Sequence, residues 1–133
     1  MIGADTNILV RVYLEDNPSE AALAKKWLRK AVSKKQLFLS SYAILEMVWV
    51  LKTKRRSREE IVEAVSDLID SPGIVVGRRE VLAAALEKYS KGKADFGDYL
   101  ILAEGEEYRA NGLATFDQQL IDDDKRCASP ASL

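Results

Sequence analysis

Acidic residues follow two short apolar segments of this chain. Asp5 comes directly after residues 1–4, and Asp117 stands just beyond residues 113–115. In a parallel sheet, side chains at the carboxyl ends of strands lie where such folds bind ligands. Asp after a strand is also common as a helix cap or turn former, so each acid alone has a structural explanation as well. Together the two positions predict carboxylates that converge at one edge of a sheet.

Glu46 interrupts a segment that is otherwise apolar. Residues 42–53 predict a helix that is apolar on nearly every side, which leaves little solvent-facing surface for a charged group. A buried carboxylate needs a cation, a hydrogen-bonding partner or a raised pKa. We therefore expect Glu46 in a tight environment, with a salt bridge to Arg or Lys as the alternative to a catalytic role.

Asp95 and Asp98 are three residues apart at the start of another predicted helix. This spacing places both carboxylates on one face of the first turn. Acids are favoured there because unpaired amides and the helix dipole stabilise negative charge. We assign Asp95 mainly to the helix cap and leave Asp98 for chemistry.

The chain contains no histidine. This excludes Ser-His-Asp and Cys-His nucleophilic sites, His-ligated zinc and imidazole acid–base catalysis. Clustered carboxylates instead suit a hard cation such as Mg²⁺ or Mn²⁺, which takes oxygen ligands and bridges to phosphate. The corresponding reaction is phosphodiester hydrolysis, in which one metal ion activates a water and a second stabilises the leaving oxygen.

The elements that must position these acids alternate between strands and helices. Strands are predicted at 1–4, 36–40, 74–76 and 113–115, with at most an edge strand near Cys127 in the polar tail. Helices are predicted at 6–14, after the cap at 17–20, at 42–53, after the capping box at 57–60, at 81–89 and at 95–111, the last ended by Gly112. Gly105 inside the last helix favours a bend or an early end. The alternation indicates an α/β fold with a parallel sheet of four to five short strands, covered by helices on both faces.

The bulk properties describe one ordinary globular domain, residues 1–133. The net charge is −1, so contact with a nucleic acid would depend on local basic patches. A single cysteine excludes an internal disulfide and suits a reducing compartment, most simply the cytoplasm. No apolar run reaches the ~18 residues that span a bilayer, and the N-terminus lacks the pattern of a signal peptide.

Four segments resemble those of a known family, and they occur in the family's order. They are residues 4–11 (Ala-Asp-Thr-Asn-Ile-Leu-Val-Arg), 41–46, 93–98 (Lys-Ala-Asp-Phe-Gly-Asp) and 115–117 (Thr-Phe-Asp). The chain resembles the PIN-domain ribonucleases over nearly its whole length, especially the VapC-type toxins of toxin–antitoxin pairs. The resemblance implies a PIN-like three-layer α/β/α fold and a Mg²⁺- or Mn²⁺-dependent endoribonuclease that cuts single-stranded RNA.

The resemblance also implies which residues do the chemistry. The acids that match the family's catalytic quartet are Asp5, Glu46, Asp98 and Asp117. Asp5 and Asp98 would bind the metal directly, and Asp117 would complete the site. Glu46 would bind metal or orient its water, and Asp95 matches an additional acid that helps to hold a metal in many of these toxins.

Four neutral residues lie beside the acids in sequence, and the resemblance implies that they support them by hydrogen bonds. They are Thr6, Asn7, Ser41 and Thr115. The family further implies a homodimer and inhibition by a small VapB-like antitoxin whose tail covers the acidic groove. Such an antitoxin often places an Arg near the metal site, which suits the bidentate pairing of Arg with carboxylate.

Local basic residues are the candidates for RNA contact. Lys93 precedes the turn that carries Asp95 and Asp98, so it is placed to meet a phosphate near the metal. Arg55 and Arg56 belong to the basic run 52–58, for which a solvated connector between helices is the alternative. RNA binding through such residues would weaken steeply with salt.

Two other readings compete with that of a toxin nuclease. Haloacid-dehalogenase-type phosphatases also begin with an Asp at the end of the first strand, but they need a second Asp two residues later, where this chain has Asn7. The second is a PIN fold with another role, either a non-toxin RNA-processing nuclease or a catalytically silent module that binds RNA or protein. Metal-dependent turnover by the free protein separates the active from the silent form.

Overall fold

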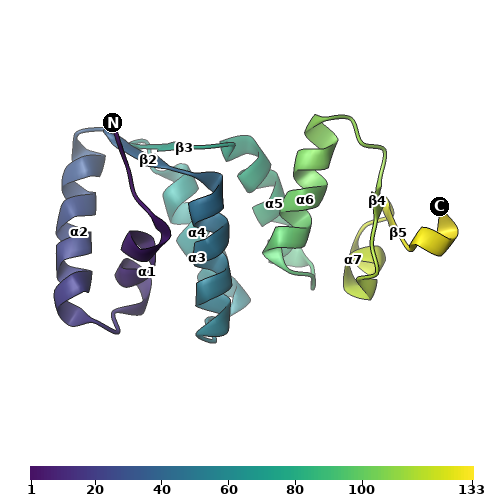
Figure 1. The fold of residues 1–133 in the computed structure, drawn as a ribbon, viewed down its shortest axis with the longest axis horizontal. Helices are drawn as coiled ribbons and strands as arrows, with labels where there is room; N and C mark the ends of the chain where they lie inside the picture. Colours follow the sequence, from purple (N-terminus) through teal and green to yellow (C-terminus); the bar gives the residue numbers. More distant parts are fainter. The chain divides into compact units, whose positions relative to one another are not determined.

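The computed structural model describes residues 1–133 as two compact units, and each is described in turn. Unit 1 comprises residues 1–79 and unit 2 comprises residues 80–133 (Figure 1). Both units combine short parallel strands with helices.

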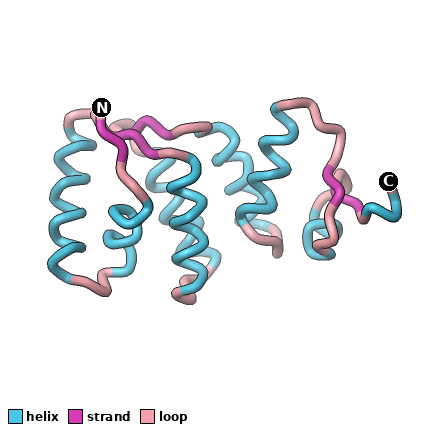
Figure 2. The backbone as a smooth tube through the Cα atoms, in the orientation of Figure 1, coloured by secondary structure: helices cyan, strands magenta, loops and turns pink.

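Unit 1 contains a three-stranded parallel sheet in the order β1-β2-β3, drawn in magenta in Figure 2. The strands are β1 (Ile2–Gly3), β2 (Leu37–Leu39) and β3 (Ile74–Val76). Leu37 and Leu39 of the central strand have no exposed surface, whereas Phe38 between them is half-buried. This alternation follows from the two-residue period of a strand, which directs successive side chains to opposite faces.

Four helices complete unit 1: α1 (Thr6–Leu14), α2 (Pro18–Ser33), α3 (Ser41–Thr53) and α4 (Arg58–Asp70). Helix α1 packs against α2 and α3, and α3 packs against α4. The predicted caps are present, since Asn17 accepts from the amide of Glu20 at 3.2 Å and Ser57 forms a capping box with Glu60. These caps fix where α2 and α4 begin.

Unit 2 contains a second parallel pair of strands, β4 (Leu113–Ala114) and β5 (Cys127–Ala128). Its helices are α5 (Arg79–Lys91, starting at the boundary), α6 (Phe96–Glu107), α7 (Gln118–Asp123) and a final 3₁₀ turn (Pro130–Ser132). The end of α5 packs on the start of α6 through Tyr89 and Phe96, whose rings meet edge to face with centroids 5.7 Å apart.

Strands form at the four predicted segments and also at Cys127, where the sequence indicated at most an edge strand. They form two sheets of three and two strands instead of the predicted single sheet, because β1 is bonded to β2 and β4 to β5. Helix α6 ends at Glu107, short of the predicted Asn111, and Arg109 adopts the left-handed conformation that follows it. Gly112 therefore does not end the helix. Its missing side chain instead lets the chain approach the carbonyl of Arg126, which a Cβ atom would meet at 2.6 Å.

Helix α7 runs into the polar tail, where the sequence predicts no helix. No helix of the structure is both long enough and apolar enough to cross a membrane.

Candidate active site

In unit 1, two of the predicted catalytic acids lie on elements that share a hydrogen bond. Asp5 caps α1, where its Oδ1 accepts from the amide of Ile8 at 3.2 Å. The next residue, Thr6, donates from its hydroxyl to Oε2 of Glu46 at 3.2 Å. This bond connects the first turn of α1, next to Asp5 in the sequence, with the middle of α3.

Glu46 is exposed, so the predicted tight environment is wrong. Helix α3 buries one face and leaves a stripe on which Tyr42 and Trp49 are 76% and 67% exposed. These aromatic residues stand four before and three after Glu46, which places all three on the same face. The sequence of α3 is apolar on nearly every side only because Tyr42 and Trp49, both exposed, are aromatic. The bonding partner of Glu46 is the hydroxyl of Thr6, not an Arg or Lys.

In unit 2, Asp95 and Asp98 form the start of α6. Asp95 is the N-cap residue, as predicted, and its amide donates to Oδ2 of Asp98 at 3.3 Å. Asp98 therefore takes part in the cap and is not left wholly free of it. Its carboxyl is half-buried, and burial together with the nearby charges of Asp117 and Asp95 raises its pKa above the usual range.

Asp117 approaches the same carboxyl from a different element. It is the N-cap of α7, where its Oδ1 accepts from the amides of Gln119 at 2.9 Å and Leu120 at 3.2 Å. Its own amide donates to the hydroxyl of Thr115 at 3.0 Å. A side-chain hydrogen bond between Asp117 and Asp98 further raises the pKa of Asp98. The predicted supporting residue Thr115 thus holds the backbone of an acid that meets Asp98.

The chemistry of these donors fits Mg²⁺ or Mn²⁺. All the donors are carboxylate oxygens, and both the burial of Asp98 and the nearby charges of Asp117 and Asp95 disfavour its charged form, a cost that a bound cation would offset. The structure contains no group of three or more acidic or cysteine side chains arranged around one metal position. Mg²⁺ does not require such a cage, because it keeps several waters and is commonly bound by one or two carboxylates.

The remaining predicted residues occupy ordinary positions. Asn7 is exposed in the first turn of α1 and, with Asp5, lines a groove of about 740 Å³ along α1 and α2. Ser41 is the first residue of α3. Arg55 and Arg56 lie in the connector between α3 and α4, where Arg56 donates to the carbonyl of Tyr13 at 3.5 Å.

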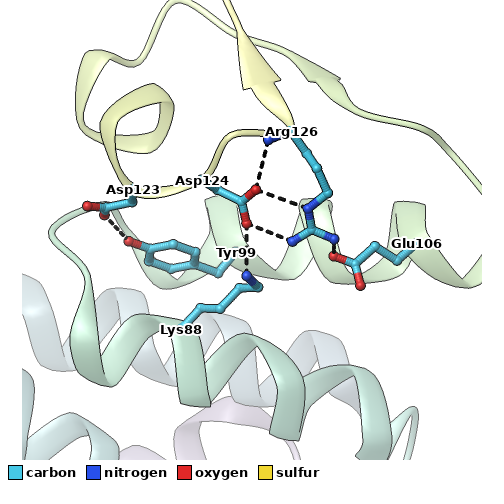
Figure 3. A network of polar contacts seen from close by, with 6 residues as sticks. All are labelled: Lys88, Tyr99, Glu106, Asp123, Asp124 and Arg126. Carbon is cyan, nitrogen blue, oxygen red and sulfur yellow. Dashed lines mark hydrogen bonds and ion pairs between the residues drawn. The ribbon is translucent and has the colours of Figure 1, made fainter.

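Sequence reasoning missed a polar network in unit 2, which includes Tyr99, Asp123 and Asp124 (Figure 3). Asp123 accepts at Oδ2 from the hydroxyl of Tyr99 at 2.5 Å and from the amide of Lys93 at 2.8 Å. The Lys93 amide and then the Tyr99 hydroxyl hold the pKa of Asp123 below its usual range. Tyr99 is 1% exposed, so its ring is part of the hydrophobic core.

The neighbouring Asp124 is the one charged residue that is buried, at 8% exposure. It accepts from Nζ of Lys88 at 2.8 Å and from Nε and Nη2 of Arg126 at 3.0 and 2.6 Å. Arg126 also pairs with Glu106 of α6. The only sequence signal for this network was the charged run 122–126, which resembles a solvated tail.

Comparison with protein families identifies the chain. The PIN domain matches residues 3–125, which is nearly the whole sequence. Neither the comparison with curated proteins nor that with solved structures gives a match. The chain therefore belongs to the PIN domain family, a three-layer α/β/α fold whose members are in general Mg²⁺- or Mn²⁺-dependent nucleases.

Proposed function

We propose that the protein is an endoribonuclease that hydrolyses RNA phosphodiester bonds at a carboxylate-bound Mg²⁺ or Mn²⁺. The observation that carries the proposal is that a PIN domain here gathers Asp95 and Asp98 at the start of α6 and Asp117 at the start of α7, where burial and the neighbouring carboxylates raise the pKa of Asp98. Carboxylates crowded together are costly unless a cation compensates them. Ionisable groups with pKa values shifted in this way are found preferentially at functional sites.

The roles of the acids are those that the family motifs imply. Asp5 and Asp98 would bind the metal directly, Asp117 would complete the site and Asp95 would help to hold a metal. When bound, the metal supplies Lewis acidity and lowers the pKa of a water. Glu46, oriented by its bond from Thr6, binds metal or orients that water. The cap bonds use Oδ1 of Asp5 and of Asp117, which fixes both side chains.

The substrate is RNA, single-stranded or locally structured, held by cations outside the acidic centre. Lys93 is exposed and stands two residues before Asp95, so its ammonium can reach a phosphate near that acid. Arg55 is exposed as well and offers a second contact together with Arg56. The net charge of −1 means that these local contacts must supply the attraction.

We further propose the biological role of a VapC-like toxin. The sequence motifs in the family's order support this role, and they favour a cytoplasmic homodimer neutralised by a VapB-like antitoxin. Expression of the chain alone should then arrest growth, and a small partner encoded beside it should relieve the arrest. Arrest that persists in Asp98→Asn would contradict a nuclease toxin, and activity without arrest would favour an RNA-processing nuclease.

The direct test is cleavage of a mixed RNA pool by the purified, partner-free protein with Mg²⁺, Mn²⁺ or EDTA. We expect metal-dependent cuts that disappear in EDTA and fall at least about 100-fold in Asp98→Asn. Asp122→Asn is the matched control, because this exposed acid of α7 bonds only to Gln118 in the same helix. Cleavage that survives both EDTA and Asp98→Asn would refute the site. A folded wild type that binds RNA without cutting it would point to a silent binding module.

A further inference from the structure

The loop before α6 is held by its backbone amides. Three consecutive N–H groups donate to three different side chains: Lys93 to Oδ2 of Asp123 at 2.8 Å, Ala94 to the hydroxyl of Tyr99 at 3.2 Å, and Asp95 to Oδ2 of Asp98 at 3.3 Å. A loop amide exposed to solvent can bond to water, which does not hold the chain in one place. Because all three amides bond to side chains instead, the path of the chain into α6 is fixed.

Tyr99 and Asp123 are themselves bonded, so their two contacts form one clamp. The Tyr99 hydroxyl accepts from Ala94 and donates to Asp123 at 2.5 Å, with the tyrosine ring buried (Figure 3). Gly92 leaves the space that the clamp needs. A Cβ atom there would collide with the Tyr99 hydroxyl and would lie 2.7 Å from Oδ2 of Asp123.

The clamp joins the two elements that carry the acids of unit 2. Asp123 is the last residue of α7 and Asp117 caps its other end, about 9 Å away for a six-residue helix. On the other side, the loop 93–95 leads directly into Asp95 and Asp98. Fixing the end of α7 to this loop therefore sets the position of Asp117 relative to Asp98.

We propose that Tyr99 and Asp123 are positioning residues for metal binding, which act by setting the separation of Asp98 and Asp117. The inference rests on the proposed function for its metal and on the structure for its geometry. Hydrogen-bonding groups behind metal ligands typically affect metal affinity or activity by about 10- to 100-fold. Loss of the clamp should weaken the metal site by a factor in this range and leave RNA binding by distant cations unchanged.

The decisive variant is Tyr99→Phe, which removes the hydroxyl and keeps the buried ring. We expect three changes: faster hydrogen exchange at the amides of residues 93–95 without metal, Mn²⁺ binding weakened about 10-fold or more by calorimetry, and a fall in kcat that exceeds any rise in KM for RNA, because Lys93 of the same loop also contacts RNA in the proposed function. Raising Mn²⁺ should restore much of the kcat. Asp98→Asn, which loses a ligand, should not be restored.

Asp122→Asn is the control for this experiment, since it lies beside Asp123 and does not contact the loop. Gly92→Ala tests the clamp by a second route, because its new methyl group must displace the Tyr99 hydroxyl. Its own control is Gly105→Ala, where the added Cβ meets Ala110 at an ordinary 3.5 Å. Thermal unfolding of each variant identifies any that simply fail to fold.

The outcomes separate the inference from the proposed function. If the wild type binds Mn²⁺ and cuts RNA but Tyr99→Phe does the same with unchanged amide exchange, the clamp has no positioning role. An equal loss in Asp122→Asn would also overturn it. If the wild type neither binds Mn²⁺ nor cuts RNA, the proposed function fails and the metal role of the clamp fails with it. Amide exchange then still reports whether the clamp holds the loop.

Discussion

The surroundings of Asp98 shift the pKa of its carboxyl in opposite directions. Its Oδ2 accepts a hydrogen bond from the amide of Asp95, which favours the charged form, but burial and the carboxylates of Asp117 and Asp95 disfavour it. The balance raises its pKa, so the folded chain holds a proton on Asp98 more tightly than the unfolded chain does. Stability from this residue is fully present below the ordinary pKa and is lost as the pH rises through the raised value.

Asp98→Asn should therefore remove activity without destabilising the metal-free protein. Asn keeps an oxygen for the Asp95 amide and removes the crowded charge, so we expect an unchanged or slightly higher unfolding midpoint at pH 7. The gain should be less than about 1 kcal/mol, because the carboxyl is mostly solvent-screened. Thermal unfolding with and without Mn²⁺ checks this. Only the wild type should be stabilised by the metal, and a clearly destabilised metal-free variant would show that the charge of Asp98 supports the fold.

At the scale of elements, a buried ion network anchors the turn after α7. Asp124 lies in this turn and binds Lys88 of α5 and Arg126 before β5, while Arg126 reaches Glu106 of α6. Burial alone would raise the pKa of Asp124, but the hydrogen bonds from Lys88 and from the Arg126 amide lower it below 3.8. This network holds the end of α7 at which the Tyr99–Asp123 clamp begins.

Asp124→Asn should destabilise the protein by about 2 kcal/mol at pH 7, since it weakens several charge-assisted hydrogen bonds at once. A lowered pKa means that the contribution is present above the ordinary value and is lost as the pH falls through the lowered one. Urea unfolding of wild type and variant at pH 7 and near pH 2 measures this. The difference should shrink on acidification, and a constant difference would show that the charge of Asp124 is not what stabilises the turn.

The elements differ in how well the sequence predicts them, for physical reasons. The strands and the caps at Asn17 and Ser57 depend on local patterns and appear where predicted. Helix α7 has only six residues, too few for a periodic pattern, although Asp117 was already a recognisable cap. The early end of α6 fits the low helix propensity of Gly105, but the close approach at Gly112 depends on Arg126, 14 residues later.

The candidate site shows the same division. The acids were found because carboxylates after strands and at helix starts are visible in one sequence. The exposure of Glu46 could not be predicted from the sequence, because it depends on which face of α3 packs against its neighbours. Tyr99 and Asp123 were missed as a pair, since residues 24 apart meet only through the packing of α6, α7 and the loop between α5 and α6.

At the scale of the whole molecule, the proposed catalytic acids are divided between the two units. Asp5 and Glu46 belong to unit 1, whereas Asp98 and Asp117 belong to unit 2. Within each unit, a cap or hydrogen bond fixes the acids without the help of the other. The proposed function uses all four acids in one reaction, so their substitutions should be energetically coupled.

A double-mutant cycle on Asp5 and Asp98 tests this coupling. Asn caps helices about as well as Asp, so Asp5→Asn should preserve α1 while removing a metal ligand. Residues that act as a unit are strongly non-additive: after one is lost, losing the second costs little more. We therefore expect kcat/KM of the Asp5→Asn, Asp98→Asn double variant to stay within about tenfold of either single variant. Asp5→Asn combined with Asp122→Asn should match Asp5→Asn alone. Losses that multiply across Asp5 and Asp98 would mean that the two units contribute independently, and a single metal-dependent reaction using both would be wrong.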